Sequence, residues 1–183
     1  GLEADFAPGS RVLVMGRSGC GKSTLLRTLA GIWPYGKGKM FLPGKALFLP
    51  QRPYLPLGSL RRALSYPDPA CTDDGKLRQA LEKVGLGALG GKLEETDDWS
   101  RILSLGEQQR LAFARVLLVR PQWVFLDEAT SALDEEREQE MYGLLQTELP
   151  ELNIMSVGHR STLMARHREK PQVDGLGGWQ LSP

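Results

Sequence analysis

Residues 16–24 read GRSGCGKST, a glycine-rich segment whose residue types suit the binding of a phosphate chain. They fit the pattern G-x-x-x-x-G-K-[ST] in full. Phosphate oxygens need closely spaced donors, and glycines allow the backbone conformations, disfavoured by a Cβ, that turn N–H groups inward. Lys22 adds a charge for the β- and γ-phosphates, and the hydroxyl of Ser23 is placed to hold Mg²⁺. The residues predicted to line this phosphate loop are Gly16, Arg17, Ser18, Gly19, Cys20, Gly21, Lys22, Ser23 and Thr24.

The segments on either side of the loop predict the elements that position it. Residues 11–15 are apolar and β-branched, as in a short buried strand, and residues 25–30 have the character of the first turns of a helix. Strand, glycine-rich turn and helix in this order make a phosphate site a far better interpretation than a chance glycine-rich turn.

A second apolar segment, residues 123–126, ends in two adjacent carboxylates, Asp127 and Glu128. Acids at the end of a buried strand are costly unless they have partners or a function. With a phosphate loop in the same chain, we expect Asp127 to hold the Mg²⁺ shell, usually through water. We expect Glu128 to orient and polarise an attacking water. The alternative is a charge pair in solvent.

Two more polar side chains follow predicted buried strands. Gln51 comes after the strand candidate 46–49, and His159 comes after the strand candidate 153–157. Gln51 is either a solvated loop residue or a group aimed at the nucleotide. A lone histidine is more often structural, but the placement of His159 favours a group that senses a phosphate.

The segment around residue 104 predicts a well-capped helix. Ser104 is suited to the N-cap, and Glu107 stands at N3, which together form a capping box before an apolar helical face. The same cap presents amides and a hydroxyl that can hold an anion. Asp134 similarly caps a predicted helix over 135–147.

The order of these elements predicts an α/β fold: a P-loop NTPase core with a mainly parallel sheet, flanked by helices. Residues from about 52 to 105 show short helical segments, over 60–64 and from about 75 to 84, and no strand pattern. We therefore expect an inserted helical subdomain over about 52–105 and a core over 1–51 and 106–183. Further short strands are expected over 2–9, 40–42 and 177–181.

Net charge, cysteine use and the length of apolar runs limit the classes of protein to which the chain can belong. The net charge of +1 over 183 residues argues neither for nor against nucleic acid, and there is no basic tail. We expect no nucleic-acid partner. Cys20 and Cys71 are not spaced like a metal site, and their use suits a reducing compartment. No apolar run approaches the roughly 20 residues that span a bilayer. Because the phosphate-loop strand comes almost at once, we expect an excised fragment of a longer protein.

Together these motifs resemble the ATP-binding cassette family over nearly the whole chain. Residues 16–24 match its Walker A motif, 103–110 its signature motif, 124–128 its Walker B motif and 131–134 its D-loop. Gln51 and His159 match the Q-loop glutamine and the switch histidine. The resemblance implies ATP and Mg²⁺ as ligands, with the metal held by Ser23, Gln51 and Asp127. It implies catalytic roles for Lys22, Gln51, Glu128 and His159.

The resemblance also implies partners. Two cassettes would face each other head to tail, with Ser104, Leu105, Gly106 and Glu107 facing the ATP of the other cassette and Ser131 and Asp134 in the D-loop. Membrane domains would dock near residues 51–60 and the lobe up to Trp99, where Tyr54, Leu55 and Leu57 are apolar. The location implied is the cytoplasmic face of a membrane, the inner membrane of a bacterium.

Two departures from the commonest family pattern refine the resemblance. Leu105 replaces the usual signature glycine, which, with the segments 32–34 (IWP) and 98–100 (DWS), is similar to the branch of peroxisomal fatty-acyl transporters and their bacterial relatives. The aromatic residue that stacks on adenine normally lies upstream of the phosphate-loop strand and is not assigned here. A fragment without it is expected to bind ATP weakly.

Two other functions stay open at this point. A soluble cassette ATPase would act on nucleic acid, ribosomes or cofactor assembly, but such proteins usually carry coiled-coil insertions, zinc sites or two cassettes. A cassette that only clamps ATP would not need Glu128 and His159, and both are present.

Overall fold

The computed structural model describes residues 5–35, 39, 41–42, 44–67, 73–158, 172–173 and 179–180. The chain divides into two compact units. We call the first the sheet unit; it comprises Gly1–Pro50, Pro121–Glu128 and Pro150–Pro183. We call the second the helical unit; it comprises Gln51–Arg120 and Ala129–Leu149.

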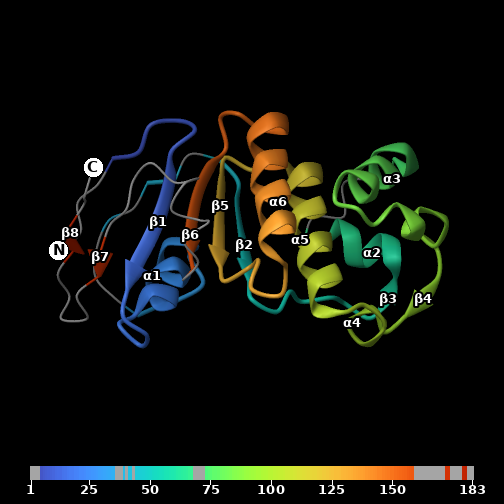
Figure 1. Ribbon diagram of the computed structural model, residues 1–183, viewed down its shortest axis with the longest axis horizontal. Helices are drawn as coiled ribbons and strands as arrows, with labels where there is room; N and C mark the ends of the chain where they lie inside the picture. Colours follow the sequence, from blue (N-terminus) through green and yellow to red (C-terminus); the bar gives the residue numbers. More distant parts are fainter. Residues whose placement is uncertain are drawn as a thin grey trace. The chain divides into compact units, whose positions relative to one another are not determined.

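The sheet unit is built on a six-stranded sheet with the strand order β2-β5-β6-β1-β7-β8 (Figure 1). All neighbouring pairs are parallel except β7–β8, which is antiparallel. The mainly parallel sheet predicted from the sequence is thus present. The strands are β1 (Arg11–Gly16), β2 (Ala46–Pro50), β5 (Trp123–Asp127), β6 (Asn153–Val157), β7 (Gln172–Val173) and β8 (Trp179–Gln180).

The register of the parallel strands aligns their carboxyl ends. Val14 pairs with Val157, Val157 with Asp127, and Asp127 with Pro50, so these residues form one row across the sheet. The chain therefore leaves β2, β5 and β6 at the same edge, the edge at which open α/β sheets bind their ligands.

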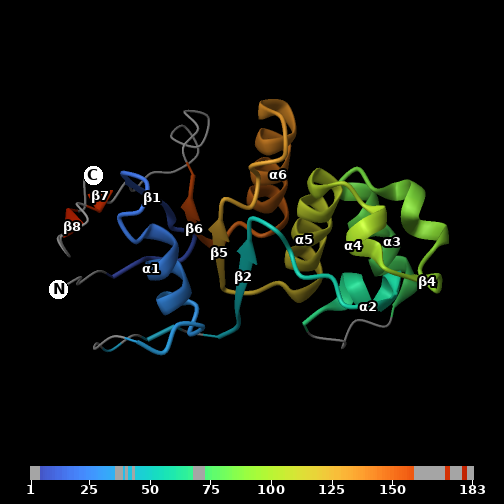
Figure 2. The same cartoon turned by 90° about the horizontal axis from the view of Figure 1, so that it is seen from below.

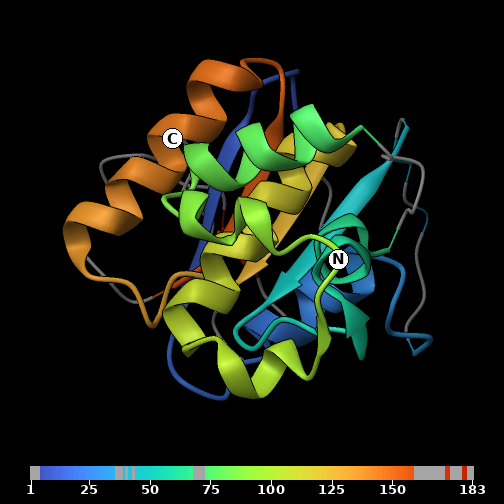
Figure 3. The same ribbon diagram turned by 90° about the vertical axis from the view of Figure 1, so that its right-hand side faces the viewer.

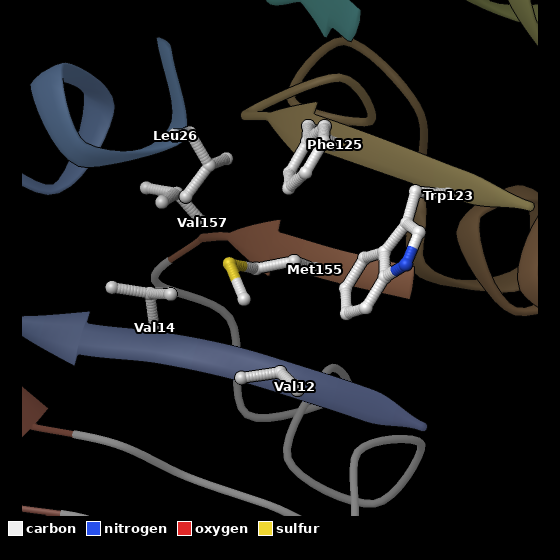
Figure 4. Packing of buried hydrophobic residues seen from close by; sticks show 7 residues of the cluster. All are labelled: Val12, Val14, Leu26, Trp123, Phe125, Met155 and Val157. Carbon is white, nitrogen blue, oxygen red and sulfur yellow. The ribbon is translucent and has the colours of Figure 1, made fainter. Parts of the chain in front are cut away.

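One face of the sheet packs against α1 (Lys22–Leu29), as Figure 2 shows. Alternate residues of β1, β5 and β6 point toward Leu26 of this helix, which is fully buried (Figure 4). The rings of Trp123 and Phe125 stack there, with their centroids 5.7 Å apart. Strands β5 and β6 are buried along their whole length, as strands of a parallel sheet covered on both faces are. The core cluster consists of Val12, Val14, Leu26, Trp123, Phe125, Met155 and Val157.

The helical unit is arranged around α5 (Leu105–Val119), which packs against α2, α3 and α6 (Figure 3). This unit contains α5 and α6 together with the short helices of the predicted subdomain 52–105, and the bounds of that subdomain stay a prediction. Its other elements are β3 (Gly58–Ser59), α2 (Leu60–Ser65), α3 (Asp74–Lys83), η1 (Gly87–Gly91), β4 (Thr96–Asp97), α4 (Trp99–Ile102) and α6 (Glu135–Glu148).

Most predicted elements are confirmed, and the differences concern short elements, since η1, α4 and β7 were not predicted. The pair β3–β4 was not expected, because two residues per strand are too few to show an apolar alternation. Residues 5–9 are not a strand but lead into a turn, in which the Ser10 amide donates to the carbonyl of Ala7. Residues 41–42 are also outside any strand. The remaining residues of these two expected strands, 2–4 and 40, lie outside the described residues, whereas β8 lies within the expected 177–181.

Candidate functional site

The phosphate loop connects β1 to α1 and depends on backbone conformations that favour glycine. Gly19 has φ 77° and Gly21 has φ 97°, both in the left-handed region. A Cβ built on either residue would meet no atom within 4 Å. The need for glycine here therefore comes from conformation and not from lack of space.

The start of α1 is free of the groups that usually satisfy a helix N-terminus. Gly21 is its N-cap, there is no side-chain cap, and its first turn carries no acidic residue. The first amides of a helix have no intrahelical acceptor and carry the positive end of the helix dipole. This end of α1 is therefore suited to an anion.

Lys22 places a positive charge inside the loop. Its side chain is buried, and Nζ donates to the carbonyl oxygens of Gly16 and Arg17, at 2.9 Å each. Both acceptors are neutral, so they orient the ammonium without cancelling its charge. The other loop residues are more accessible: Arg17, Ser18, Gly19, Gly21 and Thr24 are exposed, and Gly16, Cys20 and Ser23 are half-buried.

The two predicted metal ligands of the sheet unit lie in contact. The Ser23 hydroxyl donates to Asp127 Oδ1 at 2.6 Å, across 104 positions of sequence. Asp127 is 5% exposed, and its Oδ2 lies 3.5 Å from the guanidinium of Arg27. Among the described residues no group of three or more His, Cys, Asp or Glu could hold a metal. A hydroxyl and one carboxylate are nevertheless the kind of protein ligands that Mg²⁺ uses together with phosphates and water.

Glu128 leaves the strand in an unusual conformation. Its φ is 53°, which is uncommon for a residue with a Cβ and costs on the order of 1 kcal/mol. Its amide donates to the carbonyl of Val157 at 3.1 Å, and this bond fixes the turn at the edge of the sheet. The half-buried Glu128 therefore follows the buried Asp127 without continuing β5.

In the helical unit, Gln51 is joined to the D-loop. Its Nε2 donates to the Ser131 hydroxyl at 3.3 Å. The sequence analysis missed the residue that organises this contact, Gln109 of α5, which bonds to both Gln51 and Ser131. No local signal distinguished Gln109, because its neighbours Gln108 and Arg110 are polar as well.

The predicted capping box of the signature helix is confirmed. The Glu107 amide donates to Ser104 Oγ at 3.3 Å, and the Ser104 amide and hydroxyl donate to Glu107 Oε2 at 2.9 and 2.7 Å. The hydrogen bond from the Ser104 hydroxyl, followed by that from its amide, lowers the pKa of the Glu107 carboxyl below its ordinary value. Ser104 is exposed and Leu105 is half-buried.

Gly106 of the signature helix lies close to the D-loop, and Asp134 of the D-loop caps the helix that follows it. A Cβ on Gly106 would lie 3.2 Å from the carbonyl oxygen of Ala132, closer than most Cβ contacts. Asp134 caps α6 by accepting from the Arg137 amide at 2.7 Å, as predicted. The predicted site residue His159 lies outside the described residues.

The comparisons with known proteins identify the family. The sequence profile of the ABC transporter family matches residues 1–131 of this chain. The chain belongs to the ABC transporter family. An "uncharacterized ABC transporter ATP-binding protein" of Haemophilus influenzae is 52% identical, over 98% of this chain and 31% of that protein. The "ABC transporter D family member 2, chloroplastic" of Arabidopsis thaliana is 39% identical, over 94% of this chain and 31% of that protein.

A solved structure of a bacterial Atm1-family ABC exporter with ATP bound has a TM-score of 0.81 and 25% identity. The match covers 94% of this chain and 34% of that one. The chain thus spans about a third of the length of the relatives it matches. Two predictions are confirmed. The chain resembles cassettes of the D family and their bacterial relatives, and it has the P-loop NTPase fold.

Family membership makes this chain an ATP-binding ATPase domain. The relatives are described as transporters, so the alternative of a soluble cassette gains no support. No described helix of the chain has both the length and the apolar character needed to cross a membrane.

Proposed function

We propose that this chain is the motor domain of a membrane transporter and that it hydrolyses ATP to drive movement of a substrate across the membrane. The observation that carries the proposal is the Ser23–Asp127 contact at 2.6 Å beside a phosphate loop whose lysine is held by neutral carbonyls. Such an arrangement has little value as a structural element, whereas it provides an anion site next to a pair of oxygen ligands.

Each residue has a proposed role in the reaction. The loop amides and Lys22 bind the phosphates and stabilise the charge that spreads over the γ-phosphate during transfer. Ser23 and Asp127, with Gln51 as the family pattern implies, would hold Mg²⁺, which supplies further charge neutralisation. Glu128 orients and polarises the attacking water, and His159 assists at the γ-phosphate.

The proposal includes a second cassette, in a head-to-tail dimer that forms around two ATP molecules. The segment from Ser104 to Glu107 would then complete the site of the partner cassette. An exposed helix N-terminus with a hydroxyl at its cap suits that role.

The proposal places the chain at the cytoplasmic face of a membrane, the bacterial inner membrane, beneath transmembrane domains. Of the three apolar residues expected in a docking surface, Tyr54 is 60% and Leu57 is 67% exposed, whereas Leu55 is buried in the helical unit. We therefore propose docking through Tyr54 and Leu57, with Leu55 as a core residue.

The test is Glu128→Gln in the full-length protein that contains this chain. We expect ATP binding to stay near the wild-type level and turnover to fall on the order of a hundredfold or more, because the base that orients the water is lost. Glu136→Gln, a change of an exposed carboxylate in the first turn of α6, is the matched control and should leave turnover unchanged.

Comparable turnover in the Glu128→Gln variant would contradict the proposed mechanism. A wild-type protein that binds ATP without hydrolysing it would instead support the clamp function.

A further inference from the structure

We propose that Gln109 is a positioning residue that fixes the Q-loop and the D-loop to the signature helix, so that these three segments move together during ATP hydrolysis. The inference rests on the proposed function, since it concerns the same reaction. It assigns a role to a residue outside the phosphate loop, the carboxylates and the signature cap.

The nitrogen and the oxygen of the Gln109 side-chain amide are both hydrogen-bonded. The residue is completely buried, its Nε2 donates to the Gln51 carbonyl at 2.8 Å and to Ser131 Oγ at 3.2 Å, and its Oε1 accepts from the Ala132 amide at 3.0 Å. Leaving a buried amide without a hydrogen-bond partner is costly in free energy. The side chain of Gln109 therefore holds its partners at fixed positions.

The partners of this one side chain come from three parts of the sequence. Gln109 lies in α5, two residues beyond Glu107 of the capping box, whereas Gln51 is 58 positions and Ser131 is 22 positions away. The Ser131 hydroxyl oxygen also accepts a hydrogen bond from Nε2 of Gln51, so two side-chain amides donate to one oxygen. A displacement of any one segment therefore strains bonds to the other two.

Gly106 of α5 also packs closely against the D-loop, since a Cβ there would lie 3.2 Å from the carbonyl oxygen of Ala132. Because α5 is a continuous helix whose N-terminus carries Ser104, a shift at its first turns also moves the signature residues. The Q-loop, the D-loop and the signature helix are thus joined by a continuous set of packed and hydrogen-bonded residues, through which coupling between sites can pass.

The neighbouring residue shows what a purely structural glutamine looks like in this helix. Gln108 is also buried, but its Nε2 donates to the carbonyls of Ser100 and Leu103, at 2.8 Å each. Those bonds stay within the segment that leads into α5. Gln108 therefore supports the start of the helix and does not join the Q-loop to the D-loop.

The experiment compares Gln109→Leu with Gln108→Leu in the full-length protein. For Gln109→Leu we expect kcat to fall about tenfold, while KM for ATP stays within about twofold of wild type. The reason is that the loop residues that bind ATP are unchanged and only the positioning of Gln51 and the D-loop is lost. Gln108→Leu should change the midpoint of thermal unfolding to a similar extent, without this selective loss of kcat.

A double-mutant cycle with Ser131→Ala tests whether Gln109 acts through that hydroxyl. The double variant Gln109→Leu, Ser131→Ala should be less impaired than the product of the two single effects, because each single variant already loses the Gln109–Ser131 contact, whereas the Gln51–Ser131 contact is lost only with Ser131. The cycle of Gln108→Leu with Ser131→Ala should be multiplicative.

The proposal is overturned if Gln109→Leu leaves kcat within twofold of wild type, or if both cycles are multiplicative. Should Gln109→Leu not fold, Gln109→Met replaces it, because methionine keeps the length of the buried side chain and removes only the hydrogen-bonding amide. That variant must then lower kcat at unchanged KM, and an unchanged kcat contradicts the proposal. Failure of the proposed function is recognised separately, because the wild-type protein would then show no turnover that depends on Glu128.

Discussion

At the scale of single residues, the edge of the sheet brings a hydroxyl, a carboxylate and an ammonium group into one small region of the sheet unit. Ser23 and Asp127 are in direct hydrogen-bond contact, and Lys22 is buried immediately beside Ser23 in the chain. Glu128, which follows with a positive φ, is half-buried, whereas Asp127 is buried. The two acids therefore have different surroundings, which fits one holding a metal and the other acting on water.

The role of Ser23 predicts a magnesium-specific defect. Ser23→Ala removes both the bond to Asp127 and a metal ligand, so ATP affinity in the presence of Mg²⁺ should fall about tenfold. In the presence of a chelator, wild type and variant should bind ATP equally well. Titration of the full-length protein with a fluorescent ATP analogue measures both values.

Thr28→Ala is the matched control, because the Thr28 hydroxyl lies in the same helix but donates to the carbonyl of Thr24. Its affinity should equal that of wild type in both buffers. A Ser23→Ala variant that is weakened equally with and without Mg²⁺ would show that Ser23 does not serve as a metal ligand.

At the scale of elements, the signature helix depends on a charged capping box. The Glu107 carboxylate accepts from the hydroxyl and the amide of Ser104, and this lowers its pKa in the folded protein. The stabilisation is fully present above the pKa of the unfolded chain, about 4.3 for glutamate. It is lost as the pH falls through the lowered pKa of the folded state.

We therefore expect the opening free energy of the first turn of α5 to decrease below about pH 4.3 in wild type and to change less in Glu107→Gln. Above that pH the variant should be less stable by under about 1 kcal/mol, because the carboxylate is partly exposed to solvent. Amide hydrogen exchange of the full-length protein, corrected for intrinsic rates, measures this. Glu136→Gln is the control, and the same pH dependence in wild type and Glu107→Gln would contradict the assignment.

At the scale of the whole molecule, the chain carries both segments that the proposed composite ATP site needs, a phosphate loop and a signature helix. In the proposed head-to-tail dimer, each ATP is contacted by the loop of one cassette and the signature of the other. Two copies of this chain are the simplest source of both halves.

Complementation tests this arrangement. We expect full-length proteins with Lys22→Ala or with Ser104→Arg to be inactive by themselves, because every site in either homodimer is damaged. A mixed dimer, purified through two different tags, keeps one undamaged site and should regain activity, up to about half of wild type if the two sites turn over independently. A mixed dimer without ATPase activity would contradict sites shared between two copies.

Much of the site could be predicted from the sequence, since its parts depend on local chemistry. The phosphate loop, the Ser104–Glu107 capping box and the Asp134 cap each follow from residues a few positions apart, and a polar residue after a buried strand is visible by itself. The α/β fold followed from the order of strands and helices, because apolar runs and caps mark each element independently of its packing.

Only the tertiary structure decided which of these parts touch. The contact of Ser23 with Asp127 depends on the parallel register of strands far apart in sequence, and the role of Gln109 depends on what surrounds its amide. Leu55 turned inward while Tyr54 and Leu57 remained exposed, although all three are apolar in the same loop. The sequence determines short-range geometry. Long-range contacts depend on how complete elements pack against one another, and local sequence patterns do not specify that packing.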